Sequence, residues 1–195
     1  MATPPEYEII TVPAVGQPGR EELRQQCYDV RIDVFHHEQG FPFDTEIDEY
    51  DEEATHILLR VLPSHKPVGT IRCVKLKEYY KLTRLAVLKD YRQYRFGRTL
   101  VESLHAFVRA DARASAATLG EPGVVKVAAH SQIPVKGFYG RWVLALWVFL
   151  RLSRTAAHAI DTRDTDRFGY VPEGDEFDED GAPHQKMVLR LALSD

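Results

Sequence analysis

The chain has 195 residues, of which 44% are hydrophobic and 28% charged, a composition typical of a globular domain. Its net charge of −4 gives no general attraction to nucleic acid or to an anionic membrane, so neither is expected as a partner. The two cysteines, Cys27 and Cys73, are too few for a disulfide framework or a metal pattern. They favour a reduced, cytoplasmic compartment, with the nucleus left open.

Neither a secretory signal nor a transmembrane helix is expected. The first ten residues lack the basic and apolar regions of a signal peptide. The most apolar run, 142–150, is shorter than the roughly 20 residues that span a bilayer.

Strand-like and helix-like segments alternate along the chain. Apolar runs bounded by turn residues predict strands at 7–12, 55–62, 68–76, 82–88, 124–129 and 186–193. Apolar residues at helical spacing predict helices at 19–35, 96–116 and 133–141. The acidic stretch 41–53 is predicted to be mostly loop. This order predicts an α/β (mixed α+β) fold, in which helices flank a mixed central sheet. No repeat or linker divides the chain, so residues 1–195 are expected to form one domain.

A basic loop connects the predicted strand 82–88 to the helix that begins near Phe96. A strand that runs directly into a helix leaves backbone N–H groups unpaired. Together with the helix dipole, these groups form a site for an anion such as a pyrophosphate. Arg92, Arg95 and Arg98 add positive charge to this loop. On this chemistry alone, a solvated surface loop is the commoner alternative.

The same loop resembles the pyrophosphate-binding loop of the GNAT superfamily, the N-acetyltransferases that use acetyl-coenzyme A. The family pattern is Arg or Gln, two residues, Gly, one residue, then Gly or Ala. Arg92 and Gly97 match this pattern, whereas Arg95 stands in place of the first glycine. Glycine is usually chosen there for close backbone approach. The site can survive the change if residue 95 keeps ordinary helical angles and points outward.

This resemblance implies which residues contact acetyl-coenzyme A, the co-substrate. Leu85, Ala86 and Val87 resemble the family strand whose main chain receives the pantetheine arm and polarises the thioester. The phosphate cradle is expected at Arg92, Gln93, Tyr94, Arg95, Phe96, Gly97, Arg98 and Thr99. The implied reaction uses no metal, and the histidines show no spacing typical of a metal site.

Motifs along the rest of the chain resemble the ElaA-like branch of the same superfamily. RIDVFHHEQGF at 31–41, followed by DEYDEEATH, resembles its N-terminal signature. VGTIRCV at 68–74, HSQIPVKGFYGR at 130–141 and DGAPHQKM at 180–187 resemble later elements. Because these motifs keep their order across nearly the whole chain, the resemblance implies the GNAT acyl-CoA N-acyltransferase fold.

Acetyl transfer requires a neutral amine, a polarised carbonyl and a proton for the leaving thiolate. Tyr139 matches the tyrosine that many GNAT enzymes place near the coenzyme sulfur as general acid; packing of its ring is the alternative. Glu38 is a candidate base or water relay, or else a solvated acid at a helix end. His130 is a candidate base or substrate contact, or else a simply hydrogen-bonded histidine. The acidic stretch 44–53 either attracts a cationic amine or forms a solvated surface.

A segment at 142–167 interrupts the family pattern. Without it the chain would run FYGRFGYVPEG, which resembles the closing motif of GNAT proteins. The segment contains both tryptophans, and its first half is apolar on nearly every side. It therefore suits neither an amphipathic surface helix nor a membrane span. We hypothesise that it is an atypical insert, a retained intron or a gene-model error; a real helical excursion is the alternative.

The expected function is transfer of acetyl from acetyl-coenzyme A to a primary amine by direct attack. The acceptor is left open between a small-molecule amine and a protein amine, and a homodimer is also left open. The alternative function is a GNAT-like domain that binds an acyl-coenzyme A or a protein without catalysis. Arg95 or the segment 142–167 would then be the cause of inactivity.

Overall fold

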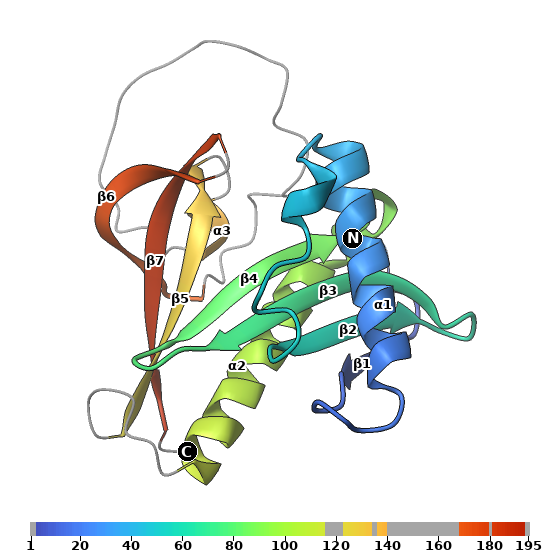
Figure 1. The fold of residues 1–195 in the computed structure, drawn as a ribbon, viewed down its shortest axis with the longest axis horizontal. Helices are drawn as coiled ribbons and strands as arrows, with labels where there is room; N and C mark the ends of the chain where they lie inside the picture. Colours follow the sequence, from blue (N-terminus) through green and yellow to red (C-terminus); the bar gives the residue numbers. More distant parts are fainter. Residues whose placement is uncertain (1–2, 116–122, 134–135, 140–167, 180, 194–195) are drawn as a thin grey trace.

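The computed structural model describes residues 3–115, 123–133, 136–139, 168–179 and 181–193 (Figure 1). Within them seven strands form one sheet, in the order β1-β2-β3-β4-β5-β7-β6. All neighbouring strands are antiparallel except β4 and β5, which are parallel. The predicted mixed sheet is therefore confirmed. The strands are β1 (Tyr7–Thr11), β2 (Thr55–Val61), β3 (Lys66–Lys75), β4 (Tyr80–Val87), β5 (Val124–Gln132), β6 (Val171–Glu179) and β7 (Ala182–Ala192).

Helices cover both faces of the sheet. Figure 1 shows α1 in front of strands β2 to β4 and α2 behind them. The predicted first helix extends further than expected, because α1 continues through the wider π-helical turns of η1. The helical elements are α1 (Arg20–Arg31), η1 (Ile32–Glu38), η2 (Phe43–Thr45), η3 (Lys89–Tyr94), α2 (Phe96–Ala114) and α3 (Lys136–Tyr139).

Alternating side chains on the strands separate the two packing layers. Ile57 and Leu59 of β2 join the main core with Leu100 of α2. Leu58, which lies between them, packs instead with Cys27 of α1. The larger core therefore lies between the sheet and α2, and a smaller one lies under α1.

Strand β6 has no counterpart among the predicted ranges. Most of its side chains are exposed and several are acidic, so it lacks the apolar alternation that marks a half-buried strand. It is an edge strand that pairs with β7 alone within the described chain.

The segment 142–167 lies outside the described residues, and the hypothesis about it stays a prediction.

The residues on either side of that segment meet in the core. The N–H of Tyr170 donates a hydrogen bond to the carbonyl of Tyr139 at 3.1 Å. The rings of these two tyrosines pack edge to face with centroids 5.5 Å apart, and the rings of Phe138 and Phe168 do so at 5.5 Å. After the segment, the chain therefore returns to the place where it left the fold.

Two histidines are buried in these cores as neutral rings. The Nε2–H of His56 donates to the carbonyl of Asp51 at 2.9 Å, and His105 Nε2 lies 2.8 Å from the hydroxyl of Tyr170. Burial lowers the pKa of His56 to about 4 and the pKa of His105 to about 4. Charging either ring would bury a cation, and for His56 the buried Arg31 and Arg72 add repulsion despite the nearby Asp51 carboxylate.

We predict that the protein loses stability as the pH falls from about 6.5 towards 4. An unfolded imidazole has a pKa of about 6.5, so in this range the unfolded chain binds protons that the folded chain excludes. Each histidine then removes up to about 2 kcal/mol of unfolding free energy at pH 5 relative to pH 8. Urea denaturation at both pH values should show a smaller loss for His56→Gln and for His105→Gln than for the wild type. An undiminished loss in both variants would contradict this account.

Candidate active site

Strands β4 and β5 pair along only part of their length. Tyr80–Leu82 is in register with Val127–Ala129, and the parallel contact ends there. Within the described residues, Thr83–Val87 continues to pair with β3, while His130–Gln132 continues to pair with β7. The two strands diverge beyond the contact (Figure 1). Divergence leaves main-chain N–H and C=O groups on both inner edges without a ladder partner, and an extended ligand can use them.

Strand β4 carries a bulge at Arg84 where it leaves β5. Thr70 is in register with Ala86 and Arg72 with Thr83, so two residues of β4 face one residue of β3. Arg84 itself has a left-handed backbone, with φ of 51°. Bulges bend a strand and re-aim its groups, and they are common beside active sites.

Past the bulge, the main chain of Val87 faces the open edge of β4. The N–H of Leu88 donates to the carbonyl of Val68 at 2.9 Å. Because main-chain groups of an antiparallel strand alternate in direction, those of Val87 point away from β3. Its carbonyl accepts a hydrogen bond from Arg92 Nε at 2.9 Å. Leu85 and Val87 pack on the α2 side, and Ala86 packs against Val30 and Val34 on the α1 side.

Arg95 forms the junction between η3 and α2. Its φ of 60° and ψ of 22° are left-handed, and its side chain is exposed. Of the two conditions given for survival of the site, residue 95 meets the outward direction but does not keep ordinary helical angles. A residue with a Cβ pays about 1–2 kcal/mol for this conformation. Here an arginine occupies a left-handed position, at the junction of η3 and α2, that glycine usually takes.

The first turn of α2 has no side-chain cap. A Cβ added at Gly97 would lie 3.6 Å from the Phe138 ring and 4.0 Å from Val87, which are ordinary contacts. Packing of the fold therefore tolerates a methyl group at this position. The uncapped turn and the small residue together fit an anion at the start of α2.

Side chains of the other predicted cradle residues have partners within the fold. Phe96 is buried, and its ring packs with Tyr94 at 5.7 Å, so Phe96 offers a ligand only its backbone. Arg98 Nε donates to Glu102 at 2.8 Å. The Thr99 hydroxyl lies 3.4 Å from the Arg95 carbonyl, and the Gln93 amide donates to the Asp90 carbonyl at 3.2 Å.

Glu38 and Arg92 join the end of η1 to the predicted phosphate loop. Arg92 Nη1 and Nη2 donate to the two Glu38 carboxylate oxygens at 2.7 and 2.6 Å. The Arg92 hydrogen bond lowers the pKa of Glu38. A carboxylate held in this way is a weaker base than a solvated one, because the ion pair stabilises its charged form.

Tyr139 lies in the main core at the end of α3. Its side chain is buried, with 7% of the residue exposed, between the rings of Phe138 and Tyr170. Burial raises the pKa of Tyr139, so the phenol keeps its proton at neutral pH. Phe138 is also the residue nearest to the Cβ position of Gly97, which places α3 beside the start of α2.

His130 follows the last residue of β5 that pairs with β4. Its Nδ1 lies 2.9 and 3.0 Å from the two carboxylate oxygens of Glu179 on β6. Phe177 packs edge to face on the imidazole, with centroids 4.9 Å apart. Val127 and Ala129 join the core on the α2 side, so alternation along β5 places His130 on the α1 side. Tyr139 and His130 thus lie on opposite faces of the sheet.

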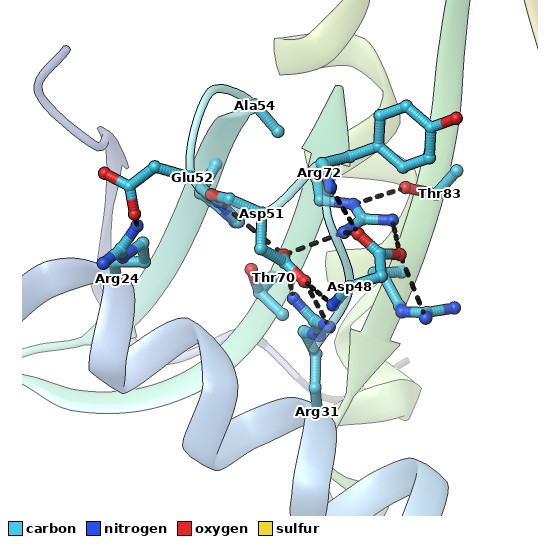
Figure 2. A network of polar contacts seen from close by, with 12 residues as sticks. Arg24, Arg31, Asp48, Asp51, Glu52, Ala54, Thr70, Arg72 and Thr83 are labelled. Carbon is cyan, nitrogen blue, oxygen red and sulfur yellow. Dashed lines mark hydrogen bonds and ion pairs between the residues drawn. The ribbon is translucent and has the colours of Figure 1, made fainter. Parts of the chain in front are cut away.

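A buried network of charges holds the acidic stretch against β3 and β4 (Figure 2). Arg31 donates to Asp51 at 2.6 and 3.3 Å. Arg72 donates to Asp48 through both terminal nitrogens, at 2.7 and 2.8 Å, and lies 2.8 Å from Asp51. Its Nε donates to the hydroxyl of Thr83 at 2.9 Å. Burial opposes ionisation of Asp51, but the two arginines outweigh it and keep the pKa of Asp51 low.

Arg84 extends this network to the bulge. It donates to the carbonyl of Thr45 at 2.7 Å and lies 3.4 Å from Asp48. Glu46 lies 3.8 Å from Arg84 and 3.7 Å from Arg31, and burial raises the pKa of Glu46. These acidic side chains are neutralised inside the protein. Glu46, Asp48 and Asp51 therefore have a structural role, whereas Asp44, Glu49, Glu52 and Glu53 of the same stretch are exposed.

Two further features of the described residues bear on the site. No three His, Cys, Asp or Glu side chains among them are grouped closely enough to hold a metal ion. In the same parts of the chain, no helix has the length and apolarity to cross a membrane.

The chain is similar to known acyltransferases in sequence and in fold. Residues 30–120 match the family described as Acetyltransferase (GNAT) domain. Uncharacterized N-acetyltransferase YjcF of Bacillus subtilis is 34% identical over 137 residues, which cover 70% of this chain and 90% of that relative.

Solved structures show the same fold at lower identity. An acyl-CoA N-acyltransferase from Pseudomonas aeruginosa has a TM-score of 0.65 at 18% identity, covering 94% of this chain and 99% of that one. Escherichia coli ElaA has a TM-score of 0.57 at 20% identity, covering 94% and 97%. These likenesses confirm the predicted fold class.

Proposed function

We propose that this chain, which belongs to the GNAT acetyltransferase family and is an acyltransferase enzyme, transfers acetyl from acetyl-coenzyme A to a primary amine by direct attack. The observation that carries the proposal is the open edge of β4 at Leu85–Val87. It leads through η3 to the uncapped start of α2 at Gly97. One continuous path therefore offers main-chain groups to an extended arm and then backbone N–H groups to a pyrophosphate.

Bound acetyl-coenzyme A would supply an activated thioester to this path. Backbone groups of Leu85–Val87 hold the pantetheine arm and polarise the thioester carbonyl. Backbone N–H groups between Gln93 and Thr99 hold the pyrophosphate. Arg92 keeps the loop in place, since its guanidinium already binds the Val87 carbonyl and Glu38.

Acid and base act from opposite faces of the sheet in this proposal. Tyr139, on the α2 side, protonates the leaving thiolate; because burial raises its pKa, this phenol is a weaker acid than a solvated one. His130, on the α1 side, accepts a proton from the amine. Glu38 remains a candidate water relay, but its ion pair with Arg92 makes it a weaker base than a free carboxylate. The acceptor class, a small-molecule or a protein amine, is left to a screen.

We also propose that residues 1–195 form one domain interrupted by the segment 142–167. The main-chain hydrogen bond between Tyr139 and Tyr170 and the contact between Phe138 and Phe168 support this division. A link of two residues, Gly140 and Arg141, would then join Tyr139 to Phe168. Such a link can span roughly 10 Å when extended, which suits two ends that meet.

The first prediction from this proposed function concerns the phosphate cradle. Calorimetry with coenzyme A should show binding by the wild type and none by Gly97→Glu, because a carboxylate at the start of α2 repels phosphate. Gly97→Ala is the matched control, since a Cβ at this position makes only ordinary contacts. It should retain binding. Equal affinity of Gly97→Glu and the wild type would rule out this cradle.

A second prediction concerns the acid. Tyr139→Phe keeps the ring in the core and removes only the hydroxyl, so the fold should survive. If the phenol protonates the thiolate, kcat should fall roughly 10²-fold or more, the usual scale of general acid catalysis. The KM for acetyl-coenzyme A should barely change. An unchanged kcat, measured by release of free thiol, would return Tyr139 to a packing role.

A third prediction concerns the segment. Deletion of 142–167 should give a more soluble and more thermally stable protein with equal or higher activity, because it removes a long loop and a strongly apolar stretch. Transcript sequencing should show the corresponding stretch spliced out of most messages. Full retention in mature messages, with loss of activity on deletion, would identify 142–167 as a true element of the enzyme.

A further inference from the structure

The carboxylate of Glu179 fixes one nitrogen of His130. Both Glu179 oxygens lie within 3.0 Å of His130 Nδ1. An ionised carboxylate only accepts hydrogen bonds, so the proton of the neutral imidazole must lie on Nδ1. The other nitrogen, Nε2, then carries a lone pair. No other described residue hydrogen-bonds to this ring, and 21% of the His130 side chain is exposed.

Neighbouring groups favour the ionised state of Glu179. The His130 hydrogen bond lowers the pKa of Glu179, and Lys81 of β4 lies 3.7 Å from its carboxylate. Phe177 covers one edge of the imidazole and itself stacks on His184 of β7. The ring is therefore held by a charge on one side and an aromatic wall on another, next to the point where β4 and β5 separate.

Other acidic residues of β6 have a different role. Glu173 lies 2.7 Å from Lys186, and Glu176 lies 3.4 Å from Lys136. These are exposed carboxylate–lysine pairs, which contribute little to stability or position. Among these three glutamates, only Glu179 binds a side chain at the end of the β4–β5 contact.

We propose that Glu179 is a positioning residue for His130: its carboxylate holds the imidazole in the Nδ1–H tautomer, so that Nε2 serves as the base for the acceptor amine. This inference rests on the proposed function. The neutral amine attacks the thioester carbon, a C–N bond forms and the C–S bond breaks. The amine proton passes to His130 Nε2, and the leaving thiolate takes the phenol proton of Tyr139. Glu179 stays ionised and stabilises the imidazolium. Solvent then takes the extra proton from His130 and returns one to the Tyr139 phenolate.

Two measurements on the full chain test this role. In ¹⁵N NMR at pH 8, His130 should be an Nδ1–H tautomer in the wild type and should lose that preference in Glu179→Gln. With acetyl-coenzyme A and an amine found by screening, Glu179→Gln should lower kcat roughly 10- to 100-fold with little change in KM for acetyl-coenzyme A, the range expected for loss of a partner that orients a catalytic ring. Glu179→Asp should restore part of both.

Glu176→Gln is the matched control, because it removes a carboxylate from the same strand without touching His130. It should leave the tautomer and kcat unchanged. An active wild type with an equally active Glu179→Gln, or an unchanged tautomer in that variant, would overturn the positioning role alone. A wild type that shows the Nδ1–H tautomer yet acetylates no amine would overturn the proposed function, and with it any catalytic role for this pair.

Discussion

The parallel contact between β4 and β5 covers only Tyr80–Leu82 and Val127–Ala129, and the position of the site follows from where it ends. Past this point, β4 stays with β3 and bends at the Arg84 bulge, while β5 stays with β7. A pair of parallel strands that separates in this way exposes main-chain polar groups that need a partner. The start of α2 lies at the end of the same edge, so the proposed anion site and the open strand edge adjoin.

Buried charges hold the acidic stretch beside the bulge of β4. The network joins three arginines to three carboxylates, namely Arg31, Arg72 and Arg84 with Glu46, Asp48 and Asp51. Buried ion pairs lose much of their attraction to desolvation, so such a network adds little net stability. Its effect is positional: removal of one partner would leave a buried charge unpaired, so the acidic stretch is held in one place over Thr83 and Arg84.

Sequence patterns predicted most of the fold because the spacing of apolar residues follows which side chains are buried. Leu23, Cys27 and Val30 mark the buried face of α1, and the apolar run of β2 marks a strand covered on both faces. Strand β6 has no such apolar spacing, since its pairing with β7 depends on main-chain groups and not on apolar side chains. The left-handed conformation of Arg95 could not be predicted either. It arises at the junction of η3 and α2, and an arginine side chain gives no sign of such angles.

Candidate site residues that are close in sequence could be predicted, whereas partners that only the fold brings together could not. The basic loop and Gly97 lie close together in the sequence, so their shared position could be predicted from spacing. Glu179 lies far from His130 in the sequence, and only the register of β5 with β7 and of β7 with β6 brings them together. Likewise, the partners of Asp48 and Asp51 come from α1 and β3, so the stretch DEYD alone did not distinguish a solvated surface from a buried network.

The geometry also separates the chemistry from the segment 142–167. Every group assigned a role in the proposed acetyl transfer lies on η1, β4, the η3–α2 region, β5, α3 or β6. Tyr139 comes immediately before the segment, but its position is set by the core, through the rings of Phe138 and Tyr170. Because the main chain closes from Tyr139 to Tyr170 by a direct hydrogen bond, the acid is held by contacts on both sides of the segment. The proposed acid is therefore held in place by the contacts between the two flanks of the segment.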